Sequence, residues 1–369
     1  MRPHLWERMV PAACGISAVL TRRGQISGEM IVSASSCLRN RGNGLGGGFA
    51  AYGLYPDRAN FFALHILSIH SAQAADKVRH LLDEYFEVSD MERVPTYGDY
   101  IPEPGLWRFF VQVPPRQVKA YASVSGDLTL GERDYVAKVV DQVNRSNLGT
   151  FVASSGKNFA VFKGIGRACE VAQHYGLNNY MANYWIHHDR FPTNSKGEAR
   201  ASHPHVEDGW EFAVVHNGEI SSYGANRITL EMHDYSFPIA TDSLVIAKAL
   251  TFFHRRGIPF EEASRMVLCA PTWEEIDRLP KEQAERYREA RIRYGSLILD
   301  GPFSIVVGFT DGIFGLRDRK GLRPLVWGTK GDLCFFGSEE AAIQAMADDV
   351  TTVQELAPGE PVFFRREQV

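Results

Sequence analysis

Short apolar runs alternate with amphipathic segments along the whole chain. Runs of strand length occur at residues 16–20, 49–54 and 61–69. Apolar side chains spaced three or four positions apart predict helices at residues 27–38 and 72–86. Further strand patterns follow towards the C-terminus, with helical patterns between them, so we expect an α+β fold with strands at both ends of the chain.

One stretch predicts a compact unit of its own. Strand, helix, strand, helix and strand patterns follow one another between residues 60 and 155. That order fits a small α/β unit of the ferredoxin-like kind. We therefore expect a leader at residues 1–13, a main domain at 14–369, and an insertion into that domain at about 60–155.

Composition and charge narrow the class of protein. The 369 residues are 44% hydrophobic and 23% charged, which is typical of a globular enzyme. A net charge of -4 gives no electrostatic reason to expect a nucleic-acid partner. No apolar run approaches the ~18 residues that a membrane span requires. Residues 1–13 lack the apolar core of a secretory signal, so we expect a cytoplasmic protein without a membrane partner.

The cysteines, histidines and glycine-rich loop of this chain do not match the sequence spacing of known metal or phosphate sites. The five cysteines are scattered without a CxxC pair, and no metal or iron–sulfur cluster is expected in this chain. The glycine-dense run at 42–48 lacks a P-loop ending and predicts a close backbone approach or a tight turn. Five crowded histidines lack HExxH spacing, and we expect each to be a loop or core residue with satisfied hydrogen bonds: His187, His188, His203, His205 and His216.

Cys14 stands directly before the first predicted strand and after the small residues Ala12 and Ala13. If the leader were removed after Ala13, this residue would carry both a thiol and a free α-amine. Such an amine titrates near pH ~8 and can accept the thiol proton without a neighbouring histidine. The alternative is a small buried thiol at the start of a strand.

Several motif-like segments follow one another along the chain. They are Cys14-Gly15-Ile16, residues 39–42, 190–194, 216–220 and 241–243, and, in the tail, 317–325, 337–339 and 356–360. Taken in this order, they resemble the glutaminase domain of class II glutamine amidotransferases, a branch of the N-terminal nucleophile hydrolases. Residues 155–158, 190–194 and 216–220 are most similar to glutamate synthase amidotransferase domains. The resemblance implies a four-layer αββα N-terminal nucleophile hydrolase sandwich.

The resemblance also implies catalytic residues. Cys14 matches the nucleophile that attacks the side-chain carbonyl of glutamine. Asn217 and Gly218 match the oxyanion donors, through a side-chain amide and a backbone N–H, and losing one such donor typically costs about 10²-fold or more in rate. Without that context, Asn-Gly is an ordinary turn sequence.

Four further residues match the substrate pocket of the family. Arg190 matches the residue that holds the α-carboxylate, where a guanidinium forms two parallel charge-assisted bonds. Asp242 matches the carboxylate that receives the α-ammonium, although by itself it reads as a helix N-cap. Thr193 matches a residue lining the same pocket, and Arg41 matches a loop arginine near the nucleophile. The turn at Arg323 resembles one that supports the core of the family, so we expect a structural role there.

The implied reaction is hydrolysis of L-glutamine to glutamate and ammonia through a Cys14 thioester. No cofactor is expected in this chain. The resemblance implies a hetero-oligomer in which a synthase-type subunit with FMN and iron–sulfur clusters receives the ammonia, as in glutamate synthase-like or N-methylglutamate synthase-like assemblies. One alternative is an unprocessed, non-catalytic subunit with a regulatory or assembly role. Another is an amidase for a different amide, which the pairing of Arg190 with Asp242 disfavours.

Overall fold

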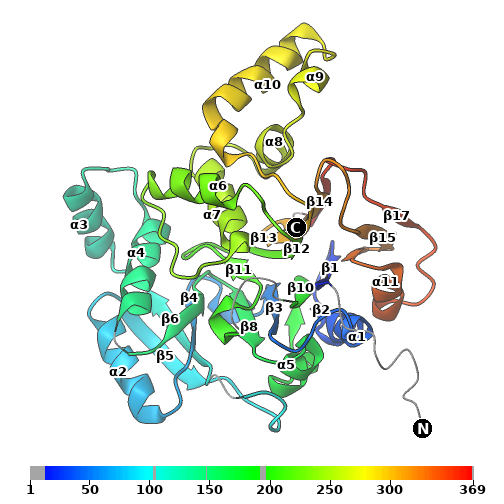
Figure 1. The fold of residues 1–369 in the computed structure, drawn as a ribbon. Helices are drawn as coiled ribbons and strands as arrows, with labels where there is room; N and C mark the ends of the chain where they lie inside the picture. Colours follow the sequence, from blue (N-terminus) through cyan, green and yellow to red (C-terminus); the bar gives the residue numbers. More distant parts are fainter. Residues whose placement is uncertain (1–12, 103–104, 147, 192–196, 368–369) are drawn as a thin grey trace.

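Two antiparallel sheets packed face to face form the centre of the molecule (Figure 1). The structure is a computed structural model that describes residues 13–102, 105–146, 148–191 and 197–367. Side chains from both sheets share one apolar core, including Ala18 and Ile186 from the first sheet and Val215 and Val306 from the second. Burial of this inner core is the main force holding the two sheets together.

The larger sheet has seven strands in the order β17-β15-β16-β1-β10-β3-β8. All seven residues of β1 (Gly15–Thr21) are buried, because helices cover one face of this strand and the second sheet covers the other. β1 pairs with β10 (Tyr184–Asp189), with Gly15 opposite Asp189. The other strands are β3 (Gly47–Tyr52), β8 (Phe159–Gly164), β15 (Val326–Lys330), β16 (Leu333–Gly337) and β17 (Val353–Glu355).

The second sheet has five strands in the order β11-β12-β13-β14-β18. Its central hairpin joins β13 (Phe303–Phe309) to β14 (Gly312–Arg317), as the apolar runs on both sides of a short turn predict. The remaining strands are β11 (His205–Val206), β12 (Ala213–Gly218) and β18 (Val362–Arg365). A small separate ladder pairs β2 (Ile26–Ser27) with β9 (Met181–Ala182).

Helices cover both outer faces. α1 (Glu29–Leu38), α5 (Ala168–His174) and α11 (Glu340–Met346) lie on the seven-stranded sheet. α7 (Asp242–His254) packs on β12 of the five-stranded sheet, with α6 (Tyr223–Glu231) beside it. The order of layers is therefore helix, sheet, sheet, helix, and the expected αββα sandwich is confirmed.

A third sheet belongs to the inserted segment, drawn in cyan in Figure 1. Its strand order is β5-β6-β4-β7, and it has a separate apolar core with α2 and α4. The sequence of elements and the strand order are those of a ferredoxin-like unit with one extra helix. The elements are β4 (Phe62–Leu67), α2 (Ala72–Asp83), β5 (Glu87–Arg93), β6 (Trp107–Gln112), α3 (Pro115–Ser125), α4 (Glu132–Arg145) and β7 (Phe151–Ser154).

A helical arm projects from the sandwich between α7 and β13, at the top of Figure 1. It consists of α8 (Phe260–Ala263), a π-helical turn (Ser264–Leu268), α9 (Trp273–Ile276) and α10 (Lys281–Tyr294). The charged helical pattern at residues 272–293 predicts one helical region, but the structure has two helices, because α9 ends at Ile276 and α10 begins after Pro280, which occupies its N-cap position. Among the described helices, none has the length and apolar character to cross a bilayer.

Candidate active site

Cys14 lies at the start of β1, where the edge of the sandwich meets the end of β10. Its sulfur accepts a hydrogen bond from the backbone N–H of Phe191, with the nitrogen 3.3 Å from Sγ. Burial raises the pKa of the Cys14 thiol to about 11, although the Phe191 N–H and the positive charges of Arg190, Arg323 and Arg41 act in the opposite direction. In the chain that retains Ala13, the thiol is therefore protonated at neutral pH.

Two of the predicted arginines lie beside Cys14. Arg41 follows α1, and its Nε donates to the backbone oxygen of Cys14 at 3.0 Å, while its Nη1 forms an ion pair with Glu339. Arg190 continues β10 by one residue, and the pairing of β1 with β10 brings it next to Cys14. Arg190 is 3% exposed, and its burial lowers the pKa of the guanidinium, an effect that Cys14 opposes.

The glycine-dense loop at 42–48 packs closely against Arg190. A Cβ atom on Gly46 would lie 2.3 Å from Ser202 Oγ and 3.1 Å from Arg190 Cδ, and Gly46 has a φ of +145°. A Cβ atom on Gly42 would lie 3.1 Å from the backbone oxygen of Arg190. The close backbone approach expected from the sequence is therefore present, and it is directed at the Arg190 side of the site.

Asn217 and Gly218 form the end of β12. Asn217 is 1% exposed, and its Nδ2 has no hydrogen-bond partner within the described part of the chain. Gly218 has a φ of +139°, and a Cβ atom there would lie 2.0 Å from the backbone oxygen of Pro302. Only glycine fits this position. A buried amide donor without an acceptor is unusual, and it is suited to receive an oxyanion.

Asp242 is the first residue of α7 and does not cap it. Thr241 occupies the N-cap position, without a side-chain capping bond. The carboxylate of Asp242 accepts instead from the backbone N–H of Ile220 at 2.9 Å, which links α7 to the turn after β12. The N-cap interpretation is therefore wrong, because the carboxylate faces the β12 turn. Thr193 lies outside the described residues.

Four of the five expected histidines form a buried cluster, in which Nδ1 of His216 lies 2.9 Å from Ser243 Oγ of α7. The ring centroids of His203 lie 3.9 Å from His188, 4.5 Å from His205 and 6.4 Å from His216. Burial is the largest cause that lowers the pKa of all four. Each has at least one ring nitrogen without a partner in the described chain, so the prediction of satisfied histidines is wrong for this cluster.

His187 fits the prediction of a satisfied histidine. Its Nδ1 lies 2.6 Å from Ser17 Oγ, and its Nε2 lies 3.3 Å from Asp189 Oδ2. His188 connects the two sheets instead, since its Nε2 lies 2.9 Å from the backbone oxygen of His216. The ends of β10 and β12 are thereby held together. The described residues contain no group of three or more His, Cys, Asp or Glu side chains arranged to hold a metal ion.

The charge of Arg323 lies near Cys14, which the sequence interpretation did not anticipate. Its Nε is buried without a partner among the described residues, and its charge lowers the pKa of both Cys14 and His216. The turn is tied to β13, because Ser304, which pairs with Asn217 of β12, donates to the backbone oxygen of Pro324 at 3.3 Å. The sequence identified the turn but gave no sign that the guanidinium acts on the thiol.

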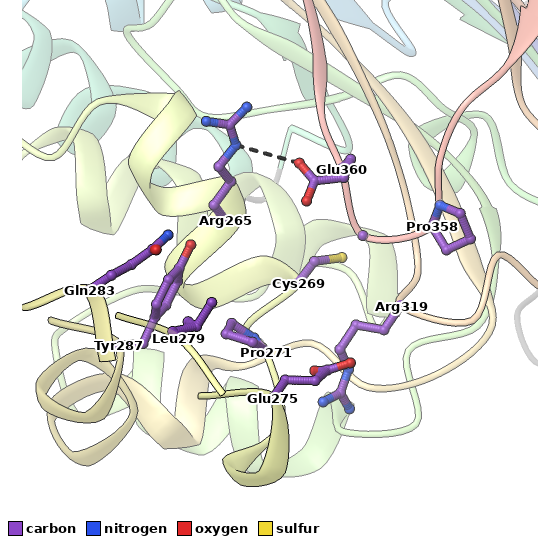
Figure 2. Close-up of a pocket in the computed structure, with 11 residues that line it drawn as sticks. Arg265, Cys269, Pro271, Glu275, Leu279, Gln283, Tyr287, Arg319, Pro358 and Glu360 are labelled. Carbon is purple, nitrogen blue, oxygen red and sulfur yellow. Dashed lines mark ion pairs between the residues drawn. The ribbon is translucent and has the colours of Figure 1, made fainter. Parts of the chain in front are cut away.

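A separate cavity of about 240 Å³ lies between the helical arm and the C-terminal strands (Figure 2). Arg265 and Glu360 face each other across it, with Nε and Oε2 3.8 Å apart. Cys269 also lines it, but its sulfur donates to the backbone oxygen of Arg317, and burial raises its pKa. None of the predicted site residues lines this cavity, so it is distinct from the site around Cys14.

The structure is an αββα sandwich with a cysteine directly before its first strand. Sequence comparison defines the family. Residues 103–368 match the model of the class II glutamine amidotransferases. This chain therefore belongs to the class II glutamine amidotransferase family. The match includes Arg190, Asn217, Gly218 and Asp242, whereas Cys14 lies before it.

The relatives differ in how much of the chain they share. An uncharacterized protein of Archaeoglobus fulgidus is 39% identical over 360 residues, which cover 96% of this chain and 92% of the relative. The amidophosphoribosyltransferase of Methanocaldococcus jannaschii is 26% identical over 220 residues, covering 59% of this chain and 40% of that enzyme. The solved glutamine phosphoribosylpyrophosphate amidotransferase of B. subtilis aligns with 95% of this chain and 47% of its own, at 15% identity and a TM-score of 0.48.

Proposed function

We propose that this protein hydrolyses L-glutamine to glutamate and ammonia, with Cys14 as the nucleophile after removal of residues 1–13. The observation that carries the proposal is the buried, unpartnered amide of Asn217 at the end of β12. The hydrogen bond from His188 to the backbone of His216 joins this end of β12 to the end of β10, where Phe191 contacts the Cys14 sulfur. These contacts support a site in which the Cys14 thiol and the Asn217 amide act on one substrate.

The reaction follows from these groups. The α-amine of Cys14 takes the proton of the thiol, and the thiolate attacks the side-chain carbonyl carbon of glutamine. The negative charge on the carbonyl oxygen is stabilised by Asn217 Nδ2 and the backbone N–H of Gly218. The protonated α-amine then gives its proton to the leaving nitrogen, which departs as ammonia and leaves a γ-glutamyl thioester. Water attacks the thioester, releases glutamate and regenerates the thiol.

The charges around the site suit a free amino acid. Arg190 supplies a guanidinium for the α-carboxylate, and Asp242 supplies a carboxylate for the α-ammonium. Thr193 is proposed to line the same pocket. Arg41 holds the backbone oxygen of Cys14, so we assign it the role of positioning the nucleophile.

A non-catalytic subunit is the second candidate, and one observation favours it. With Ala13 still attached, the nitrogen of Cys14 is an amide that cannot act as a base, and burial raises the pKa of the thiol to about 11. Both facts predict an unreactive thiol in the uncut chain. Removal of the leader therefore decides between an enzyme and a subunit with a regulatory or assembly role.

The ammonia released requires an acceptor. On the resemblance to glutamate synthase domains, we propose a synthase-type partner subunit that carries FMN and iron–sulfur clusters, in a glutamate synthase-like or N-methylglutamate synthase-like complex. The chain itself is proposed to need no cofactor, because a thiol, an amine and hydrogen-bond donors are sufficient for amide hydrolysis.

Glutamate release by the purified protein tests the proposal. We expect Cys14→Ala to abolish it. Asp242→Asn keeps an acceptor for the Ile220 N–H but loses the charge, so the KM for glutamine should rise about tenfold or more while kcat changes less. An Asp242→Asn enzyme with an unchanged KM would remove the assigned role of this carboxylate.

A further inference from the structure

A buried lysine contacts the segment that packs against Gly46, the residue whose backbone oxygen accepts from the N–H of Arg190. Lys163 lies on β8 and is 2% exposed. Its Nζ donates to three backbone oxygens of one short segment: Arg200 at 3.2 Å, Ser202 at 3.1 Å and Pro204 at 3.4 Å. The three acceptors match the three N–H groups of an ammonium, whereas a neutral amine would have only two.

Burying the charged Lys163 ammonium costs desolvation free energy, and well-placed backbone oxygens can offset that cost. Burial lowers the pKa of Lys163 to about 7, the charge of Arg190 acts in the same direction, and Asp208 opposes them. The ring of Phe151 adds a cation–π contact at 5.3 Å. Backbone oxygens and this ring are the partners that offset desolvation of the ammonium.

The clamped segment supports the proposed glutamine site from behind. Ser202 and Arg190 both pack against Gly46. A Cβ atom on Gly46 would lie 2.3 Å from Ser202 Oγ and 3.1 Å from Arg190 Cδ. The backbone N–H of Arg190 donates to the Gly46 oxygen at 2.9 Å. His203, in the same segment, stacks on His188 of β10. Gly46 thus contacts Ser202 and hydrogen-bonds to Arg190, so a shift of the segment would reach Arg190 through the Gly46 backbone.

We propose that Lys163 is a positioning residue whose ammonium clamps residues 200–204 behind Arg190 and thereby sets the affinity for glutamine. The inference rests on the proposed function of Arg190 as the carboxylate site. Lys163 touches no reacting atom in this account and acts through Arg190 alone.

The test replaces Lys163 with methionine, which has an unbranched side chain one atom shorter and removes all three donors. We expect amide hydrogen exchange to accelerate at residues 200–206, because the segment loses its anchor. The KM for glutamine should rise about tenfold or more, with kcat within about threefold of wild type. Lys163→Gln retains two amide donors, and it should recover part of the affinity.

Lys248→Met is the matched control. Lys248 is also buried and pairs with Glu207 at 3.0 Å, but it does not contact the 200–204 carbonyls. The control should lose thermal stability and keep the wild-type KM. Unchanged exchange at 200–206 in Lys163→Met, or an equal rise of KM in Lys248→Met, would overturn the proposal. Hydrogen exchange requires no glutamine, so failure of the clamp is distinguishable from failure of the glutaminase function.

Discussion

At the scale of single residues, two buried asparagines offer a direct comparison. Asn217 Nδ2 has no partner in the described chain, whereas Asn226 Nδ2 donates to the backbone oxygens of Ser296 and Ile298 at 2.7 and 3.1 Å. Both side chains are 1% exposed. The amide of Asn226 is used by the fold, and the amide of Asn217 remains available to a ligand.

Replacing each asparagine with alanine should therefore have opposite effects. Asn217→Ala should lower kcat about 10²- to 10³-fold with little change in Tm, because no native hydrogen bond is lost. Asn226→Ala should lower Tm and leave kcat per folded molecule unchanged, since two buried carbonyls lose their donor. Glutamate release and thermal unfolding of the two variants provide the measurement, and a large Tm loss in Asn217→Ala would contradict the oxyanion assignment.

The candidate residues were assigned from short motifs that resemble a family, and their functions remain proposals. Asn217 and Gly218 are adjacent, and their order on a strand end was visible in the sequence. Arg323 was expected to be structural, and its closeness to Cys14 was not predictable because the two residues lie near opposite ends of the chain and only the fold brings them together. The four-histidine cluster was read as separate satisfied residues for the same reason, since its members come from different strands and loops.

At the scale of elements, the end of β12 depends on a glycine that no other residue can replace. A Cβ on Gly218 would meet the Pro302 oxygen at 2.0 Å, so the strand and the turn before β13 must move apart. We expect Gly218→Ala to lose at least about 2 kcal/mol of unfolding free energy and most of the activity.

Gly224→Ala is the control for this prediction. Gly224 lies in α6, and a Cβ there would have no atom within 4 Å. This variant should gain about 0.5–1 kcal/mol, because alanine is the better helix former, and keep full activity. Denaturant unfolding of both variants gives the comparison, and equal stability of Gly218→Ala and wild type would contradict the geometry at β12.

Elements with a clear apolar period were predictable, and those without one were not. α2 and α4 follow the helical spacing of the sequence, and β1 follows an apolar run. β5 (Glu87–Arg93) was missed because it is a polar edge strand without a fully buried residue. Its place in the sheet comes from pairing with β6. The first residue of β6, Trp107, pairs with the last residue of β5, Arg93, which lies 14 residues earlier in the chain.

At the scale of the whole molecule, the histidine cluster predicts how stability depends on pH. The pKa values of His188, His203, His205 and His216 are lowered in the fold from an ordinary value of 6.5. Below pH 6.5 the unfolded chain therefore binds more protons than the folded chain, and stability is lost as the pH falls. Asp208, whose pKa is raised to about 7, acts in the opposite direction, whereas burial also lowers the pKa of His65 and His254, which act with the cluster.

Thermal unfolding at pH about 7.5 and about 5 should thus give a lower Tm at the lower pH. His203→Leu removes one titrating group from the centre of the cluster, so the difference in Tm between the two pH values should shrink. A Tm that does not change with pH, or the same pH dependence in His203→Leu, would contradict the assignment of neutral, buried imidazoles.

The central claim is that Cys14 becomes an N-terminal nucleophile that forms a thioester with glutamine. The most direct measurement is the intact mass of the protein, quenched in acid during incubation with glutamine. The account predicts the mass of residues 14–369 together with a fraction that carries one γ-glutamyl group, and no such fraction in Cys14→Ala. A full-length mass that retains residues 1–13, with no γ-glutamyl adduct, would contradict it.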